Sequence, residues 1–297
     1  MNHPAEIAIH MFLQSVGKGE GVVSDEILDQ VATDVKDALK RQFTGPSRKD
    51  SFRLRMSNLG RPTCQLWFDK NKPEEAAPFP PFFLMQMIIG DITEAVFKGL
   101  LRASGVEFGD SENVQLEVAG AKINGSYDMK LNGNIDDVKS ASPWSYTNKF
   151  ADFETLEAGD SFGYVSQLVA YAVASKSGVG GWWAVNKSNG EFKYVSAENA
   201  DVDAVMGKIA DTVTYINEDK PFKRCFDAVP ETFYSKATGN LVLNSSCNFC
   251  NYKKSCWPEM TSIPKLVTRE KTKVGQITDY VFIAPEHLEK AESYESS

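Results

Sequence analysis

The chain has 297 residues, of which 42% are hydrophobic and 24% charged, proportions typical of a water-soluble globular protein. Its net charge of −8 argues against a non-specific polyanion binder such as a histone, but leaves open a nucleic-acid enzyme with unevenly distributed charge. The N-terminal residues lack the basic region and uninterrupted apolar core of a secretory signal, and no segment reaches the ~18 apolar residues of a membrane span. We therefore expect a cytoplasmic protein with reduced thiols and no membrane partner.

Helical patterns dominate the first third of the chain. Residues 5–16 and 24–42 have helical periodicity, and a further helix is predicted over 57–68. The segment 83–104 has the pattern of a long helix, and Gly105 follows it as a typical C-terminal stop.

Strand patterns follow in two groups. Strands are predicted over 113–119, 121–131, 134–139, 181–187 and 191–196. Helices are predicted over 160–176 and 198–217, and residues 221–297 are predicted to be rich in loops. This order of elements favours an α/β fold, with one mixed sheet flanked by helices.

The turn Asn132-Gly133 is a strong signal for a two-residue β-hairpin. If these two residues form the whole loop, Asp128 lies opposite Asp137, and Lys139 projects on the same face as Asp137. Asp136 then projects on the other face, so we expect Asp136→Ala to be nearly neutral for the activity of this site. Two opposed carboxylates repel each other, and a divalent cation between them would explain why the sequence tolerates the pair.

Three of the five cysteines, Cys247, Cys250 and Cys256, form a C-x-x-C-x-x-x-x-x-C cluster. In a reduced protein such a cluster indicates a metal site, and the scarcity of histidine points to Cys64 or Cys225 as the fourth ligand. Four thiolates suit Zn²⁺ or an iron–sulfur cluster, and one triplet with one distant cysteine favours iron–sulfur. For Cys225 the simpler interpretation is a small buried apolar side chain.

These motifs resemble those of the PD-(D/E)XK nuclease superfamily. The resemblance is to its iron–sulfur branch, which includes CRISPR-associated exonucleases and the nuclease domains of bacterial recombination helicase–nucleases. The matching residues are Gly125-Ser-Tyr-Asp128, Asp137-Val-Lys139, Gln167 with Tyr171, and Gly90 with Glu94, framed by Cys64 and the cysteine triplet. Many iron–sulfur members have His where this chain has Glu94, and Glu resembles the form in phage-type recombination exonucleases.

The resemblance implies a restriction-endonuclease-like core with a central mixed β-sheet flanked by helices. It would occupy residues 53–257, between an N-terminal helical region at 1–52 and an extension at 258–297. The implied ligands of Mg²⁺ or Mn²⁺ are three carboxylates and one carbonyl, from Asp128, Asp137, Glu94 and Val138. Lys139 would orient the attacking water and stabilise the developing charge. Gln167 would contact a phosphate or support the ligands, and Tyr171 would lie beside it on the same helix. A 4Fe–4S cluster would be held by Cys64, Cys247, Cys250 and Cys256.

The expected activity is a metal-dependent DNA exonuclease in recombination, replication or DNA processing, in a bacterial cytoplasm or encoded by a phage. Its partners would be single-stranded DNA or DNA ends, and a recombinase or single-strand-binding protein. Two alternatives stay open: a non-catalytic DNA-binding adaptor, and an interaction module stabilised by zinc. Phosphate contacts from Arg53, Arg55 and Arg61, and base stacking by Trp182 or Trp183, are further expectations, against solvated arginines and core tryptophans.

Overall fold

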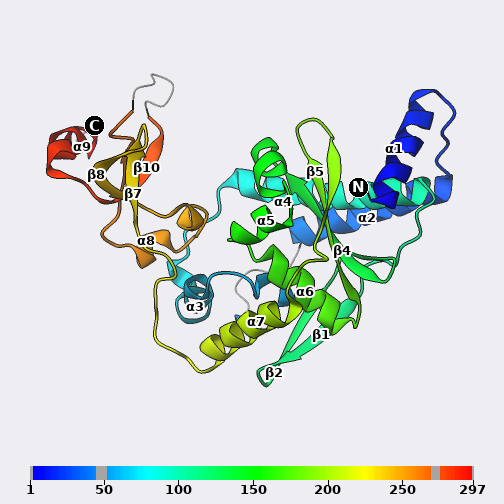
Figure 1. The fold of residues 1–297 in the computed structure, drawn as a ribbon, viewed down its shortest axis with the longest axis horizontal. Helices are drawn as coiled ribbons and strands as arrows, with labels where there is room; N and C mark the ends of the chain where they lie inside the picture. The colour runs from blue at the N-terminus through cyan, green and yellow to red at the C-terminus, as the bar shows by residue number, and fades with distance from the viewer. Residues whose placement is uncertain (1–2, 45–51, 269–274, 296–297) are drawn as a thin grey trace. The chain divides into compact units, whose positions relative to one another are not determined.

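The computed structural model describes residues 3–44, 52–268 and 275–295 (Figure 1). The chain forms two compact units, each built from two separate segments. The larger unit contains Met1–Arg61 and Phe79–Lys220, and the smaller unit contains Pro62–Pro78 and Pro221–Ser297. The predicted α/β class is confirmed, because mixed and antiparallel sheets are flanked by helices.

The larger unit is built on a four-stranded mixed sheet with strand order β3-β4-β5-β6. Its strands are β3 (Met129–Leu131), β4 (Asn134–Ala141), β5 (Gly178–Asn186) and β6 (Phe192–Ser196). β4 and β5 run parallel, whereas β3 pairs with β4 and β6 with β5 in antiparallel fashion. Both middle strands carry runs of buried residues, as expected of strands that are covered on both faces.

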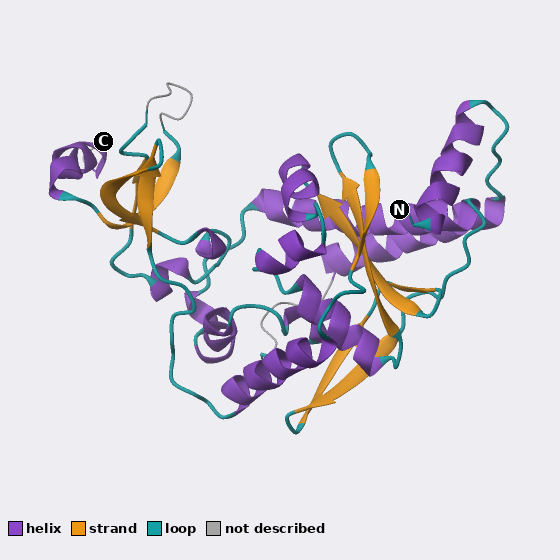
Figure 2. Ribbon diagram, in the orientation of Figure 1, coloured by secondary structure: helices purple, strands orange, loops and turns teal. Residues whose placement is uncertain are grey.

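Helices cover both faces of this sheet (Figure 2). The helices of the larger unit are α1 (Pro4–Gly17), α2 (Asp25–Thr44), α4 (Pro81–Ala103), α5 (Phe153–Ala158), α6 (Tyr164–Ala174) and α7 (Val202–Asn217). One hydrophobic core contains Trp183 with residues of α1 and α4, and a second contains Trp182 with residues of α6 and α7. Both tryptophans are fully buried, so the expectation that either stacks on bases is wrong.

The predicted strand 121–131 is divided in two by the structure. β2 (Ala121–Ser126) pairs with β1 (Asn113–Val118) in a separate two-stranded sheet, and the chain enters β3 only at Met129. Gly125 lies near the break and packs so closely on the Tyr171 ring that a Cβ atom would approach Cε1 to 2.7 Å. The expectation of one continuous sheet is therefore wrong, and the break places Asp128 between two strands.

The predicted helix over 57–68 is also divided. The structure has a short 3₁₀ turn at Met56–Asn58 and then α3 (Thr63–Asn71). Between them, Gly60 packs against Gly163, where a Cβ on Gly60 would lie 2.4 Å from the Gly163 Cα. Pro62 then ends the turn and precedes the new helix, because proline lacks the N–H that a continuous helix needs.

The smaller unit contains more regular structure than the loop-rich segment that the sequence predicts. Its antiparallel sheet has the strand order β7-β8-β10-β9, with β7 (Val229–Phe233), β8 (Lys236–Val242), β9 (Thr261–Pro264) and β10 (Ile277–Phe282). Its helices are α3, α8 (Lys253–Cys256) and α9 (Leu288–Glu295). Among the residues that the structure describes, no helix is both long and apolar enough to cross a membrane.

Asp136 projects from β4 on the face opposite Asp137, but that face is the protein core rather than solvent. Gly181 N and the Tyr194 hydroxyl donate to its Oδ1 at 2.9 and 3.0 Å, and Trp183 Nε1 donates to its Oδ2 at 3.1 Å. Burial raises the pKa of Asp136 to about 6 despite these hydrogen bonds. The predicted direction of the Asp136 side chain is therefore confirmed, but its burial among three donors means that Asp136→Ala should not be neutral for stability.

We expect Asp136→Ala to lower the free energy of unfolding by roughly 3 kcal/mol or more, because three buried donors lose their acceptor. The matched control is Asp137→Ala, one residue along the same strand, which removes a carboxylate that accepts a hydrogen bond from the Lys139 ammonium. Urea denaturation followed by tryptophan fluorescence measures both. A loss below ~0.5 kcal/mol for Asp136→Ala would show that the three hydrogen bonds are not made in solution.

Candidate active site and cysteine cluster

The hairpin has the register that its sequence predicts. Asn132 and Gly133 both have positive φ angles, as a two-residue turn of this type requires, and Met129 pairs with Asp136. Asp128 directly precedes β3, and its Oδ2 accepts a hydrogen bond from Val138 N at 3.1 Å. The turn and the strand break together hold the Asp128 carboxylate beside the middle of β4.

Asp137 and Lys139 share one face of β4, as the two-residue period predicts. Lys139 Nζ lies 2.6 Å from Asp137 Oδ1 and 2.5 Å from Oδ2. Burial opposes the Lys139 ammonium, but the Asp137 and Asp128 carboxylates outweigh it and raise its pKa. Lys139 is therefore a firmly protonated cation between acidic groups.

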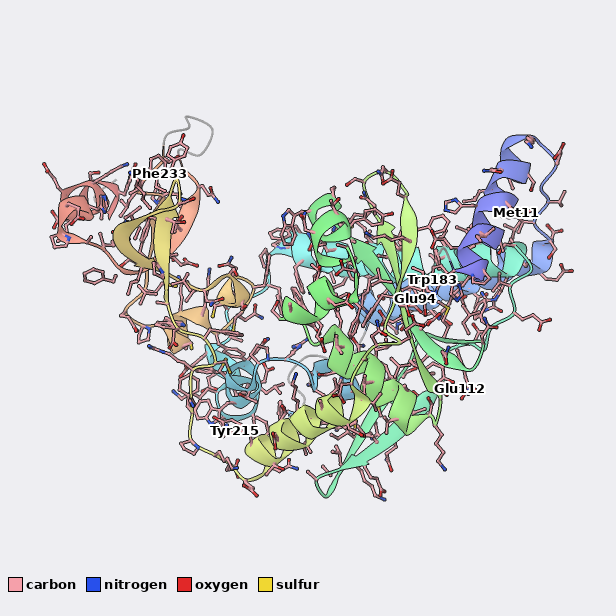
Figure 3. All side chains as sticks on the ribbon, viewed as in Figure 1. Met11, Glu94, Glu112, Trp183, Tyr215 and Phe233 are labelled. Atoms are coloured by element: carbon pink, nitrogen blue, oxygen red, sulfur yellow. The ribbon has the colours of Figure 1, made fainter. Side chains whose placement is uncertain are left out.

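Glu94 reaches the same site from α4 (Figure 3). Lys98, one turn later, donates to its Oε1 at 2.7 Å. Burial and then the charge of Asp128 raise the pKa of Glu94, and the charge of Glu94 in turn disfavours ionisation of Asp137. The structure thus brings together the three carboxylates that the sequence motifs select, with two ammonium groups beside them.

The carboxylates repel one another in a buried site. Burial and then the charge of Asp137 raise the pKa of Asp128 to about 6. Asp137 Oδ2 is buried and lies 2.5 Å from the Lys139 ammonium. Carboxylate oxygens are the donors that Mg²⁺ and Mn²⁺ prefer, so this donor set fits a hard divalent cation. Within the described residues, no three His, Cys, Asp or Glu side chains are already arranged as a finished metal-binding group.

These pKa shifts predict that Asp128→Asn stabilises the metal-free protein at neutral pH. A carboxyl group whose pKa is raised on folding contributes stability below its unfolded pKa of 3.8, and that contribution is lost as the pH rises through about 6. Asparagine cannot ionise, so the melting temperature of Asp128→Asn should exceed that of the natural chain at pH 7.5. The difference should shrink as the pH falls through about 6 and vanish below 3.8.

Differential scanning fluorimetry of both proteins in a chelator across this pH range measures the effect. Asp136 is present in both proteins, so its own titration cancels in the comparison. A melting difference that does not depend on pH would contradict the raised pKa of Asp128.

Gln167 and Tyr171 lie one turn apart on α6, and Gln167 Nε2 donates to the Tyr171 hydroxyl at 3.5 Å. Tyr171 is 4% exposed, and its ring packs against Gly125. Burial raises the pKa of Tyr171, and the charge of Asp128 contributes to the shift. Tyr171 is therefore a core residue whose polar end is near the carboxylates. The close packing of its ring leaves no room for a Cβ atom at position 125, so glycine occupies that position.

Two neighbours of Lys139 carried no clear signal in the sequence. The Tyr164 ring lies 5.2 Å from Lys139 Nζ and 4.3 Å from Lys149 Nζ. Lys149 ends a π-helical turn, Ser145–Lys149, and its buried ammonium has no hydrogen-bond partner among the described residues. Its closest carboxylate oxygen, Asp160 Oδ1, is 3.9 Å away. One aromatic ring on α6 thus adjoins one lysine on β4 and another on the π-helical turn, so the arrangement depends on how these three elements pack.

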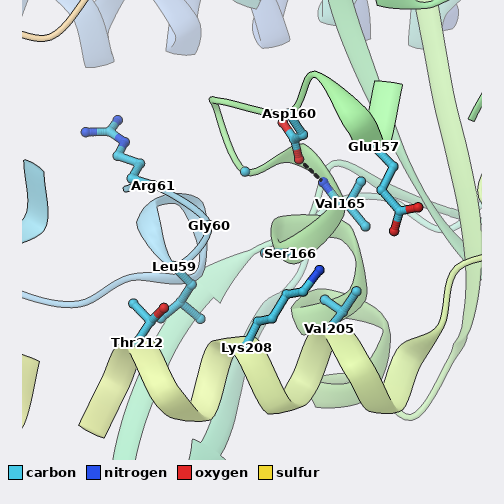
Figure 4. Close-up of a pocket in the computed structure, with 11 residues that line it drawn as sticks. Leu59, Gly60, Arg61, Glu157, Asp160, Val165, Ser166, Val205, Lys208 and Thr212 are labelled. Carbon is cyan, nitrogen blue, oxygen red and sulfur yellow. Dashed lines mark hydrogen bonds between the residues drawn. The ribbon is translucent and has the colours of Figure 1, made fainter. Parts of the chain in front are cut away.

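A pocket of about 210 Å³ lies elsewhere in the larger unit (Figure 4). Its lining includes Arg61 and Lys208, which are cationic, and Glu157 and Asp160, which are anionic. Asp160 Oδ2 accepts a hydrogen bond from Val165 N at 2.9 Å. The predicted hairpin residues do not line this pocket, whereas Arg61, an expected phosphate contact, does. Arg53 and Arg55 are exposed.

All five cysteines belong to the smaller unit and are free thiols. Cys64 is the second residue of α3, and the same helix is fixed by Phe68, which stacks on Tyr252 at 5.0 Å. The Tyr252 hydroxyl donates to Asp69 Oδ1 at 2.7 Å. These contacts join α3 to the segment that carries Cys247, Cys250 and Cys256, so the distant cysteine and the triplet share one unit.

Cys225 is not the buried apolar residue that the simpler interpretation expects. It is exposed, and its Sγ accepts a hydrogen bond from Cys64 N at 3.1 Å, with Thr63 Oγ1 at 3.3 Å. The preceding Arg224 lies over the Trp257 ring at 3.8 Å, and its Nε donates to the carbonyl of Cys256 at 2.8 Å. Cys225 is thus held beside both parts of the cysteine site.

The thiols are close enough to affect one another's ionisation. Burial and then the charges of neighbouring thiols raise the pKa of Cys247 to about 11. Hydrogen bonding from Cys64 lowers the pKa of Cys225 to about 6, and the same interaction raises the pKa of Cys64. The donors are sulfur atoms without disulfides, a chemistry that fits an iron–sulfur cluster or Zn²⁺.

No family model matches the chain, and no curated protein is significantly similar to it. Among solved structures, the chain is similar to the crystal structure of SSO0001, with a TM-score of 0.39 and 12% sequence identity. The similarity covers 74% of this chain and 93% of SSO0001. So distant a likeness assigns neither a family nor a function to this chain.

Proposed function

We propose that this chain is a metal-dependent DNA exonuclease with a restriction-endonuclease-like core. The observation that carries the proposal is the arrangement of Asp128 and Asp137 with Lys139. Two carboxylates from the two arms of one hairpin lie beside a single ammonium, and burial raises the pKa of both carboxyl groups. A purely structural hairpin has no need of this costly arrangement, because buried like charges destabilise a fold.

The proposed metal ligands are the carboxylates of Glu94, Asp128 and Asp137 and the carbonyl of Val138. A bound Mg²⁺ or Mn²⁺ would lower the pKa of water and neutralise charge on the phosphate. The hydrogen bond from Val138 N fixes the Asp128 carboxylate, so two ligands are oriented by one strand. Such fixed orientation reduces the reorganisation needed to bind the ion.

In the same proposal, Lys139 stabilises the negative charge that develops on the phosphate and orients the attacking water. In the metal-free protein the Asp137 and Asp128 carboxylates outweigh burial and raise the pKa of Lys139, which keeps it an ammonium. Tyr164 limits where the ammonium can lie, because its ring covers one side of the lysine. Gln167 and Tyr171 support the site from α6.

We further propose that the smaller unit holds a structural 4Fe–4S cluster through Cys64, Cys247, Cys250 and Cys256. The unit has only small hydrophobic cores, so a metal site would add much of its stability. The proposed partners are DNA ends or single-stranded DNA, and a recombinase or single-strand-binding protein. The proposed setting is recombination, replication or DNA processing in a bacterial cytoplasm, with a phage as one source of the gene.

A nuclease assay on DNA labelled at either the 5′ or the 3′ end tests this function. We expect single- or double-stranded DNA to shorten progressively from one end with Mg²⁺ or Mn²⁺, and to stay intact in a chelator. DNA binding without cleavage, in protein with a full metal content, would favour the non-catalytic adaptor instead. A colourless protein that contains zinc would remove the iron–sulfur part of the proposal.

A further inference from the structure

The cysteine site contains one thiol more than a four-coordinate site can use. Three of its thiols come from one short segment, Cys247 to Cys256, so a tetrathiolate site needs one further sulfur. Two cysteines compete for that position, because Cys225 Sγ lies 3.1 Å from the backbone nitrogen of Cys64. The two thiols therefore lie side by side at the same corner of the site.

Cys225 has the surroundings of a metal ligand. Its Sγ accepts the N–H of the second residue of α3, a helix of nine residues, and lies 3.3 Å from the Thr63 hydroxyl. Backbone N–H groups at a helix N-terminus favour a thiolate, and hydrogen bonds to sulfur tune iron–sulfur sites. Arg224 fixes the neighbouring backbone to the triplet through the carbonyl of Cys256.

We propose that Cys225 and Cys64 form an interchangeable pair, either of which can supply the fourth thiolate of the cysteine site. This inference rests on the proposed metal site in the smaller unit, but not on the proposed nuclease activity. The thiol that does not bind the metal stays next to the ligand, because the Cys64 N–H donates to Cys225 Sγ. The chain can therefore keep its metal when one of the two cysteines is lost.

The test is the metal content of Cys64→Ser, Cys225→Ser and the double variant, each purified anaerobically as the full chain. Iron, zinc and acid-labile sulfide are measured per chain, together with the visible absorption spectrum. Each single variant should lose less than ~2-fold of the metal, and the double variant ~10-fold or more, because only the latter removes both candidates for one ligand position. Cys64→Ser keeps the backbone N–H that holds Cys225, so the remaining ligand stays oriented.

If one single variant loses as much metal as the double variant, that cysteine is the sole fourth ligand and the proposal is wrong. If the double variant keeps its metal, neither cysteine is a ligand, which also overturns it. Measuring iron, zinc and acid-labile sulfide together distinguishes a failure of this inference from a failure of the proposed 4Fe–4S cluster. Zinc without sulfide in the natural chain would refute the 4Fe–4S cluster, while the comparison of variants would still decide the role of the pair.

Discussion

Asp128→Ala and Lys139→Ala should each reduce the proposed DNA cleavage by ~10³-fold or more, because the first removes a proposed metal ligand and the second removes the charge proposed to face the phosphate. Both side chains belong to one cluster of charges, in which Lys139 Nζ lies 2.6 Å from Asp137 Oδ1. The effects should not add in the double variant, since the residues act on the same step. The measurement is the initial rate of nucleotide release from end-labelled DNA at saturating Mn²⁺.

The matched control is Lys122→Ala. Lys122 lies on β2 and pairs with Glu117 at 3.2 Å, and both side chains are more than two-thirds exposed. Lys122→Ala removes the same positive charge from the larger unit but leaves Asp128 and Asp137 unchanged, so cleavage should change less than ~2-fold. Circular dichroism should show the same fold in all three variants. Cleavage at the natural rate by both Asp128→Ala and Lys139→Ala would remove the catalytic assignment of the hairpin.

The proposed cluster predicts that Cys250→Ser loses iron and destabilises the smaller unit. Cys250 belongs to the triplet, for which the structure offers no substitute thiol of the kind that Cys225 offers to Cys64. Because binding of a structural metal is part of the folding free energy, we expect metal content to fall ~10-fold or more and the brown colour to disappear. Hydrogen exchange should accelerate in β7 to β10, while β4 and β5 in the larger unit keep their protection.

Asn248→Ala is the control for this prediction, because Asn248 is an exposed residue between two cysteines of the triplet. It should keep the iron, the absorption spectrum and the exchange pattern of the natural chain. A Cys250→Ser protein that remains folded and iron-loaded would refute the role of the triplet in holding the smaller unit together.

Local sequence patterns were sufficient to predict the hairpin, because the residues that determine its turn and register lie close together in the chain. Asn132 and Gly133 adopt the positive φ angles of the predicted turn, and this turn fixes the register that places Asp137 and Lys139 on one face. The same reasoning was wrong about the surroundings of Asp136. Its three donors come from β5 and β6, which lie some 45 to 58 residues further along the chain.

The sequence by itself determined the turn, the strand register and the identity of the grouped carboxylates and thiols, since turn geometry and the alternation of side chains are local properties. Tertiary structure alone decided which face of β4 is core, that Tyr164 adjoins Lys139, and that Cys225 lies beside Cys64. The physical reason is that burial and close contact arise from segments distant in the chain. Their packing depends on the whole core and leaves no periodic signal in any one segment.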